Sequence, residues 1–217
     1  MSKPRLRPGV GPTESYDLAH VKLLMGNESE ISQWAPEGAS LGRRFREHAP
    51  LRAKINPPHE PGNVLIIKGR VWGNDTREPL ERVRIDVWQA DANGRYDNHD
   101  GPVDPETFIN RARLYCDQDG YYEFETVHPG AYEQEGPNGI IQRAPHIHFR
   151  VRDPDYVHLV TELFFAGDRY HDVDPFFKPS LVIELTPRKR NNQPYHEGIF
   201  DIVLSRNPDE AQAGQRN

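Results

Sequence analysis

The sequence of 217 residues has one cysteine, Cys116, so no disulfide bond can form within the chain. A lone cysteine is most often a small buried side chain, and we predict that structural role for Cys116. No apolar run reaches the roughly 18 residues of a membrane-spanning helix, and no apolar segment follows the basic N-terminal residues as in a secretory signal. These absences favour a cytoplasmic protein that makes no membrane contact.

Positive charge is not in excess either. Asp and Glu number 33 against 27 Lys and Arg, which gives a formal net charge of −6, and no basic run dominates. A nucleic-acid-binding surface requires clustered positive charge, so we expect no nucleic-acid partner.

Helical periodicity is almost absent as well. It is clear only at residues 14–26, ESYDLAHVKLLMG, where Gly26 is a suitable stop and where we predict one short helix.

From residue 63 onward, apolar and polar residues alternate in short stretches. A period of two places apolar side chains on one face of a strand, and the 20 prolines and 17 glycines supply turns between strands. Seven such segments occur: 64–73, 81–91, 121–127, 144–152, 158–167, 180–186 and 198–205. With almost no helix between them, they predict an all-β fold with a β-sandwich core of about seven to nine strands.

Two histidines stand two residues apart in one of these segments, APHIHFRVR at 144–152. Residues i and i+2 of a strand share a face, so the imidazoles of His146 and His148 are expected side by side. Imidazole suits first-row transition metals, yet pairs of histidines also occur on strands that bind no metal. The pair alone therefore leaves a metal site and an ordinary strand face both open.

Tyrosines follow turn glycines at three places: Tyr96 in NGRY, Tyr132 in PGAY, and the pair Tyr121 and Tyr122 in DGYY. A tyrosine after a turn commonly caps the end of a core. Within reach of two histidines, its phenolate would instead be a hard, anionic ligand that selects Fe(III), and the charge of the metal would remove the phenol proton. We expect Tyr121 and Tyr122 to pack in the core.

Four motifs follow one another along the chain: DVWQADANGRYDN, RLYCDQDGYYEFETVHPGAY, QRAPHIHFRV and TELFFAGD. In this combination the chain resembles the intradiol ring-cleavage dioxygenases, and among them most the iron-bearing chain of the protocatechuate 3,4-dioxygenases. The resemblance runs from about Val64 to Val203. It is specific because four dispersed ligand positions come in the right order with the right neighbours.

The resemblance implies one ferric ion per chain, held by Tyr96, Tyr132, His146 and His148. Tyr96 would stay bound, whereas Tyr132 would leave when substrate binds and would accept one of its protons. Arg143, three residues before the first histidine, would stabilise negative charge on the reacting ring carbon. The implied reaction cleaves a catechol, with a protocatechuate-like substrate favoured, between its two hydroxyls with O2 and gives a cis,cis-muconate-type product.

Three residues depart from the family pattern. Glu162 in TELFF replaces the usual glutamine, and we count it as catalytic, either in contact with the substrate or in a salt bridge with an arginine such as Arg143. Gln134 stands where protocatechuate enzymes tend to carry an aromatic residue, which leaves the substrate open. His128 in VHPGAY is either a surface turn residue, which we favour, or a group near Tyr132.

We divide the chain into an N-terminal arm with the short helix at 1–62, a catalytic β-sandwich domain at 63–205 and a flexible tail at 206–217. Catechol 1,2-dioxygenases usually carry a larger helical domain that dimerises, and the short N-terminal region favours the protocatechuate-type architecture instead. In that architecture the arms of the chain pack on a partner subunit. We therefore expect a homo-oligomer, or a heteromer with a related chain.

Two other functions remain open on the sequence. The first is a non-catalytic β-sandwich module that binds a ligand or a protein through its loops, since sandwiches host many functions. The second is a ferrous oxygenase site built from His146, His148 and Glu162. Colour separates them from the ferric site, because only tyrosinate ligands predict a tyrosinate-to-iron charge-transfer band.

Overall fold

The computed structural model of the chain describes residues 44–98, 104–136 and 139–207. Within these ranges the chain is almost entirely β, and its single helical element is the 3-10 turn η1 at Pro179–Leu181. The described part contains no helix that is long and apolar enough to cross a membrane. The all-β prediction is confirmed, whereas the short helix predicted at 14–26 lies outside the described residues.

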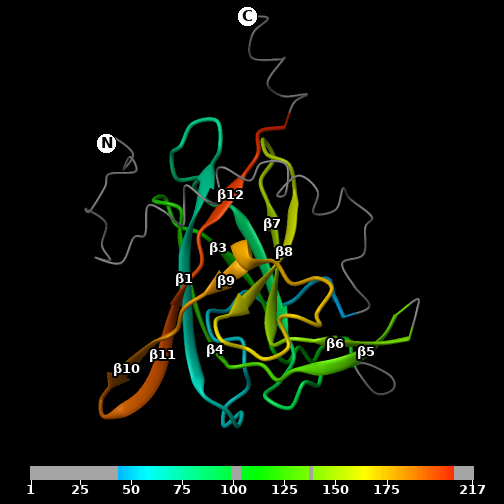
Figure 1. Ribbon diagram of the computed structural model, residues 1–217. Helices are drawn as coiled ribbons and strands as arrows, with labels where there is room; N and C mark the ends of the chain where they lie inside the picture. The colour runs from blue at the N-terminus through cyan, green and yellow to red at the C-terminus, as the bar shows by residue number, and fades with distance from the viewer. Residues whose placement is uncertain (1–43, 99–103, 137–138, 208–217) are drawn as a thin grey trace, which may run out of the picture.

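Two five-stranded sheets make up most of the molecule (Figure 1). The first contains, in hydrogen-bonding order, β10 (Thr186–Arg190), β11 (Gln193–Ile199), β1 (Val64–Gly73) and β12 (Ile202–Leu204), with β4 (Tyr121–Val127) also paired to β1. The second contains, in order, β3 (Arg111–Tyr115), β2 (Arg84–Gln89), β7 (His146–Arg152), β8 (Leu159–Phe165) and β9 (Val182–Ile183). Strand β1 runs parallel to β11 and β12 and antiparallel to β4.

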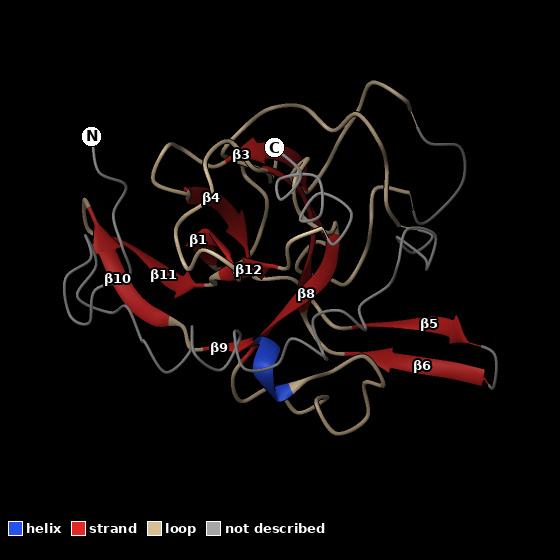
Figure 2. Cartoon of the chain, turned by 90° about the horizontal axis from the view of Figure 1, so that it is seen from above, coloured by secondary structure: helices blue, strands red, loops and turns tan. Residues whose placement is uncertain are grey.

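A third, two-stranded sheet extends away from the other strands (Figure 2). It consists of β5 (Tyr132–Gly136) and β6 (Gly139–Arg143), and we call it the β5–β6 arm. The described ranges thus form twelve strands, ten of them in the two large sheets, against the seven to nine expected. Every predicted segment contains strand residues. The strands that sequence reading missed are β3, β5, β6 and β10, and each has only five residues, too few to show a period of two clearly.

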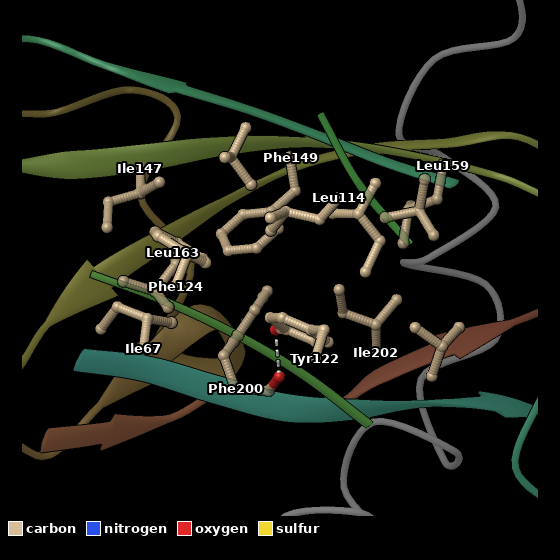
Figure 3. Packing of buried hydrophobic residues seen from close by; sticks show 14 of the residues in the cluster. Ile67, Leu114, Tyr122, Phe124, Ile147, Phe149, Leu159, Leu163, Phe200 and Ile202 are labelled. Carbon is tan, nitrogen blue, oxygen red and sulfur yellow. Dashed lines mark hydrogen bonds between the residues drawn. The ribbon is translucent and has the colours of Figure 1, made fainter. Parts of the chain in front are cut away.

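The core lies between the two large sheets, where side chains from both interdigitate (Figure 3). Ile67 of β1 and Phe124 of β4 enter it from the first sheet, and Phe149 of β7 and Leu163 of β8 enter it from the second. None of the four is more than 1% exposed. Burial of a side chain of this size stabilises the fold by roughly 1.5–3 kcal/mol. The alternating apolar residues of the predicted strands therefore form the core that holds the sandwich together.

The two tyrosines of DGYY face opposite sides of β4. Tyr122 is buried, as expected, and donates a hydrogen bond to the carbonyl oxygen of Phe200 at 2.5 Å (Figure 3). Tyr121 lies on the outer face, where its hydroxyl donates to the Glu123 carboxylate at 2.5 Å. The prediction that both pack in the core is wrong for Tyr121, because adjacent residues of a strand point to opposite faces. Cys116 is buried, as predicted.

Strand β7 positions the two histidines. Ile147 faces the core, so His146 and His148 point to the opposite face of the second sheet. In the ladder, His148 lies between Trp88 of β2 and Glu162 of β8. The outer face of this sheet, beside the base of the β5–β6 arm, is therefore where the predicted site residues can meet.

The described part of the predicted N-terminal arm, residues 44–62, lies along the sandwich. A backbone bridge joins Lys54 to Glu125 of β4, and Ile55 belongs to the main core. This segment therefore packs as part of the same unit as the two sheets. The boundaries placed after residues 62 and 205 stay predictions.

Candidate metal centre

Four side chains converge at the outer face of the second sheet: Tyr96, Tyr132, His146 and His148. The Nε2 atoms of His146 and His148 are 3.1 Å apart. The Tyr132 hydroxyl lies 3.4 Å from His146 Nε2, and the Tyr96 hydroxyl lies 3.1 Å from His148 Nε2. The structure thus brings together all four residues that were predicted as metal ligands.

The second nitrogen of each histidine is engaged elsewhere. His146 Nδ1 donates to the carbonyl oxygen of Ala144 at 2.6 Å, and His148 Nδ1 lies 3.3 Å from a carboxylate oxygen of Glu162. A ring nitrogen that faces an acceptor carries the proton, so both Nε2 atoms present a lone pair to the centre. Trp88 stacks on the His148 ring, with centroids 4.7 Å apart, and fixes its plane.

A tight turn after β2 places Tyr96. The Asp91 carboxylate accepts two backbone hydrogen bonds within this turn, both at 2.8 Å. Gly94 has a φ of +79°, a conformation that favours glycine. A Cβ atom at Gly94 would lie only 2.2 Å from the carbonyl oxygen of Ala131. The turn therefore packs directly on the residue before Tyr132, which brings the two tyrosines together.

The two tyrosine rings meet edge to face, with centroids 5.5 Å apart and an interplanar angle of 88°. Tyr96 is buried, whereas Tyr132, the first residue of β5, is half-buried. Burial is the largest cause that raises the pKa of both phenols. Neither phenol is therefore ionised at neutral pH unless a strong positive charge lies beside it.

The donor set suits a hard trivalent cation. Ligand atoms that each lie about 2 Å from one metal are roughly 3 Å from one another, which is comparable to the separations at this centre. Burial lowers the pKa of His146 to about 3 and the pKa of His148 well below its ordinary value, so both rings are neutral and able to act as ligands. Two imidazole nitrogens, with two phenol oxygens that the charge of a metal would deprotonate, fit Fe(III).

Arg143 and Glu162 form a buried ion pair beside the histidines. Arg143 Nη2 and Glu162 Oε2 are 2.5 Å apart, and each side chain is at least nine-tenths buried. The salt bridge with Arg143 was one of the two arrangements considered for Glu162. Burial raises the pKa of Glu162 to about 6, although the guanidinium of Arg143 opposes that shift.

A metal site of His146, His148 and Glu162 is less favoured by this geometry. One ligand atom from each residue lies within 4.8 Å of the others. However, Glu162 Oε1 lies 3.3 Å from His148 Nδ1 and 4.0 Å from His146 Nε2, so the carboxylate faces the protonated side of the His148 ring. The phenols, not the carboxylate, are the oxygen groups closest to both Nε2 lone pairs.

Sequence reading missed two residues at the site. Trp88 meets His148 because the two are opposite each other in the β2–β7 ladder, a pairing that only the strand register reveals. Asp174, in YHDVDPFF, binds Arg143 Nε through both carboxylate oxygens at 3.1 Å, and its side chain is fully buried. Nothing in the sequence around Asp174 distinguishes it from the neighbouring aspartates.

Gln134 and His128 take different positions. Gln134 shares a face of β5 with Tyr132 and is partly exposed. The His128 ring packs on Phe165, with centroids 4.4 Å apart, and its Nδ1 donates to the carbonyl oxygen of Pro129 at 2.9 Å. Burial lowers the pKa of His128. His128 is thus partly buried, not the surface residue that we favoured, because an aromatic ring covers it.

Comparisons with known proteins point to one family. Residues 41–206 match a family model described as Dioxygenase. The β chain of protocatechuate 3,4-dioxygenase from Burkholderia cepacia is 38% identical over 79% of this chain and 77% of its own length. The 6-chlorohydroxyquinol 1,2-dioxygenase from Cupriavidus pinatubonensis is 36% identical over 66% of this chain. In that second case the chain spans only 54% of the length of the relative.

Solved structures give the same result. The dioxygenase domain of a dioxygenase and carbohydrate-binding protein fusion from Streptomyces sp. SirexAA-E is 31% identical, with a TM-score of 0.61. The match covers 76% of this chain and 95% of that domain. The 3-chlorocatechol 1,2-dioxygenase of Rhodococcus opacus 1CP is 26% identical, with a TM-score of 0.67, over 76% of this chain and 70% of its own.

Proposed function

The chain belongs to the intradiol ring-cleavage dioxygenases, a family of iron-dependent oxidoreductases, and we propose that it cleaves a catechol ring between its two hydroxyls with O2. Both oxygen atoms of O2 would enter a cis,cis-muconate-type product. One observation carries the proposal: two phenol oxygens and two unprotonated imidazole nitrogens converge on one point.

We assign Tyr96, Tyr132, His146 and His148 as the ligands of one Fe(III) per chain. Bound Fe(III) would supply the Lewis acidity that holds a catechol and activates it toward O2. Both imidazoles are already oriented by acceptors at their Nδ1 atoms, so neither has to turn in order to bind the metal. Tyr96 is the more deeply buried phenol, which suits a ligand that stays in place.

Tyr132 is placed to exchange a proton with the substrate. It is half-buried at the base of the β5–β6 arm, and its hydroxyl accepts a hydrogen bond from Arg143 Nη1 at 3.4 Å. The guanidinium favours the phenolate, so Tyr132 can act as a ligand and can take a proton from a catechol hydroxyl when it is displaced. Arg143 would then stabilise negative charge on the reacting ring carbon, with Glu162 holding the guanidinium.

For the substrate we propose a protocatechuate-like catechol, which carries an anionic ring substituent. Arg44 supports this choice, because its guanidinium lies 5.6 Å from the centroid of the Tyr96 ring and acts electrostatically on Tyr132. A cation at this position can receive a carboxylate on the ring. Gln134, on the same face of β5 as Tyr132, would offer the substrate an amide contact.

We also propose that the protein acts in the cytoplasm as a homo-oligomer, or as a heteromer with a related chain. Leu51 and Ile140 are 69% and 66% exposed, and Ile140 lies on the protruding β5–β6 arm. Large apolar side chains in such positions suit a subunit interface. The thiol of Cys116 is free and buried, which is compatible with a reducing compartment.

Colour and oxygen uptake test this function. Purified protein loaded with Fe(III) should bind one equivalent per chain, absorb visible light through tyrosinate-to-iron charge transfer, and consume O2 when a catechol is added. Among catechol, protocatechuate, hydroxyquinol and chlorocatechols, protocatechuate should give the highest kcat/KM. A protein that stays colourless after ferric loading would contradict the function. A coloured enzyme that prefers another catechol would contradict only the substrate.

Tyrosine variants assign the band to its ligands. Tyr96→Phe and Tyr132→Phe should each weaken the charge-transfer band, because each removes one phenolate ligand. Tyr121→Phe is the matched control, since Tyr121 lies on the outer face of the other large sheet and should leave the band unchanged. A band that survives both ligand substitutions would refute the assignment.

A further inference from the structure

Two buried carboxylates, those of Glu162 and Asp174, bind different nitrogens of the Arg143 guanidinium. Glu162 binds its Nη2 at 2.5 Å, and both oxygens of Asp174 accept from its Nε at 3.1 Å. The ring of Phe176 covers the guanidinium, with 4.5 Å between Cζ and the ring centroid. These contacts leave Nη1 directed at the Tyr132 hydroxyl. The guanidinium therefore has one fixed position over the candidate metal centre.

Asp174 also binds the backbone next to the histidines. Its Oδ2 accepts a hydrogen bond from the amide of Ala144 at 2.9 Å, and the Ala144 carbonyl oxygen accepts from His146 Nδ1. Its Oδ1 accepts from the amide of Phe176 at 2.9 Å, which closes the turn that carries Asp174. One buried carboxylate thus contacts both Arg143 and the residue whose carbonyl orients His146.

We propose that Asp174 is the positioning residue for Arg143, holding the guanidinium toward Tyr132 and aligning the junction between β6 and β7. Its contacts are with Arg143 and with backbone amides, so it acts through Arg143 and is not itself a catalytic residue. Its effect on turnover rests on the proposed function. Its effect on the mobility of Arg143 does not depend on iron or substrate.

Glu162 alone would not fix the guanidinium. It contacts one terminal nitrogen, and a side chain held at one terminus can still turn about its bonds, whereas the second contact at Nε removes that freedom. Burial acts to lower the pKa of Arg143, but Glu162, Tyr132 and Asp174 more than offset it and raise the pKa. The guanidinium thus stays charged between its two carboxylates.

Asp174→Asn is the first test, with Asp172→Asn as the matched control. Asp172 lies in the same loop, undergoes the same change of charge and has an exposed side chain. In an isotope-labelled sample without iron, the Arg143 Nε–H proton should exchange with solvent at least about tenfold faster in Asp174→Asn than in wild type. Asparagine turns one of the two acceptor oxygens into an NH2 group that faces the Nε–H and a backbone amide, both of which are donors. Asp172→Asn should leave this exchange rate unchanged.

Turnover is the second test. In the Fe(III)-loaded enzyme, Asp174→Asn should lower kcat roughly 10- to 100-fold through misplacement of Arg143, with a much smaller change in KM. In an Arg143→Ala background the same substitution should lower kcat several-fold less than it does in wild type, because the part of its effect that acts through Arg143 is already lost. Asp174→Glu keeps the charge and should recover part of the lost kcat, which also covers the case in which Asp174→Asn loosens the fold.

Three results would overturn the proposal. They are an unchanged Nε–H exchange rate in Asp174→Asn, an equal loss of kcat with and without Arg143, and no recovery in Asp174→Glu. A wild-type protein that is colourless and inactive with every catechol would contradict the proposed function instead. In that case the exchange measurement alone decides the role of Asp174.

Discussion

Buried side chains at the candidate centre respond to burial in different ways. His146 becomes a neutral base, because burial lowers its pKa to about 3 and no carboxylate reaches its Nε2 closely. Glu162 and Arg143 are buried as partners, so each offsets the cost of removing the other from water. The chemistry available to each residue therefore depends on its contacts, not on its type.

The contribution of the Glu162–Arg143 contact can be tested by measuring the free energy of unfolding of Glu162 variants. We expect Glu162→Gln to lower the free energy of unfolding by only about 1–2 kcal/mol, because an amide oxygen can still accept from Arg143 and Asp174 keeps the guanidinium paired. Glu162→Ala should cost more, about 3–5 kcal/mol, since it leaves a cavity beside a buried charge. Urea unfolding of the iron-free proteins measures both. Equal losses in the two variants would show that the hydrogen bond is unimportant.

Cys116 gives a second test with single-residue resolution. Its Sγ donates to the carbonyl oxygen of Leu80 at 3.0 Å, and burial raises the pKa of the thiol to about 11. At pH 8 only about one thiol in a thousand is then ionised, so a thiol reagent should react at least about 100-fold more slowly with the native protein than with the unfolded one. The two reaction rates are measured with a disulfide reagent that releases a coloured thiol. The native protein is measured in buffer, and the unfolded protein is measured in guanidinium chloride. Similar rates would refute a buried thiol.

At the scale of elements, most residues of the candidate centre lie at turns or at the ends of strands. Tyr96 follows the turn after β2, Tyr132 begins β5, and Arg143 ends β6. His148 lies within β7 with a ladder partner on each side, Trp88 of β2 and Glu162 of β8, whereas His146 begins the strand and pairs only with Phe164 of β8. The geometry of the centre therefore depends on how the two tyrosine turns pack on each other.

Gly94→Ala tests that packing, with Gly167→Ala as its control. Both glycines have a φ of +79°, but a Cβ at Gly94 would lie 2.2 Å from the Ala131 carbonyl oxygen, whereas nothing lies within 4 Å of a Cβ at Gly167. Gly167→Ala should cost about 1 kcal/mol from backbone strain alone. Gly94→Ala should cost more than about 2 kcal/mol, because the turn must also shift away from Ala131.

Thermal unfolding and the visible band measure this pair. Gly94→Ala should weaken the charge-transfer band of the Fe(III)-loaded protein, since it displaces Tyr96 relative to Tyr132, and Gly167→Ala should leave the band unchanged. Equal stability losses with unchanged bands in both variants would mean that the contact with Ala131 does not position Tyr96.

At the scale of the whole molecule, the histidines lie on the middle strand of the second large sheet. Strands β2 and β7 each have a hydrogen-bonded neighbour on both sides. Strand β10, by contrast, ends its sheet, and all five of its residues are exposed. The histidine pair thus lies on the middle strand of its sheet, whereas β10 is an exposed edge strand where we expect local opening.

Hydrogen exchange should reveal this gradient. Amides of β7 should exchange only through global unfolding and at least about 100-fold more slowly than amides of β10, which open locally. Mass spectrometry of peptic fragments after timed labelling measures both regions in one experiment. Equal protection of the two strands would indicate that the molecule unfolds as one unit without local opening.

The sequence by itself determined the all-β class, the core-facing residues of the main strands and the four residues proposed as ligands. It could do so because a period of two and the family motifs are local patterns. Whether those four residues hold Fe(III) stays a prediction. Only the tertiary structure decided that Trp88 stacks on His148, and that Asp174 joins Glu162 around Arg143. Those contacts depend on strand register and on a loop that folds back over the sheet, and such long-range pairings leave no periodic signal in the chain.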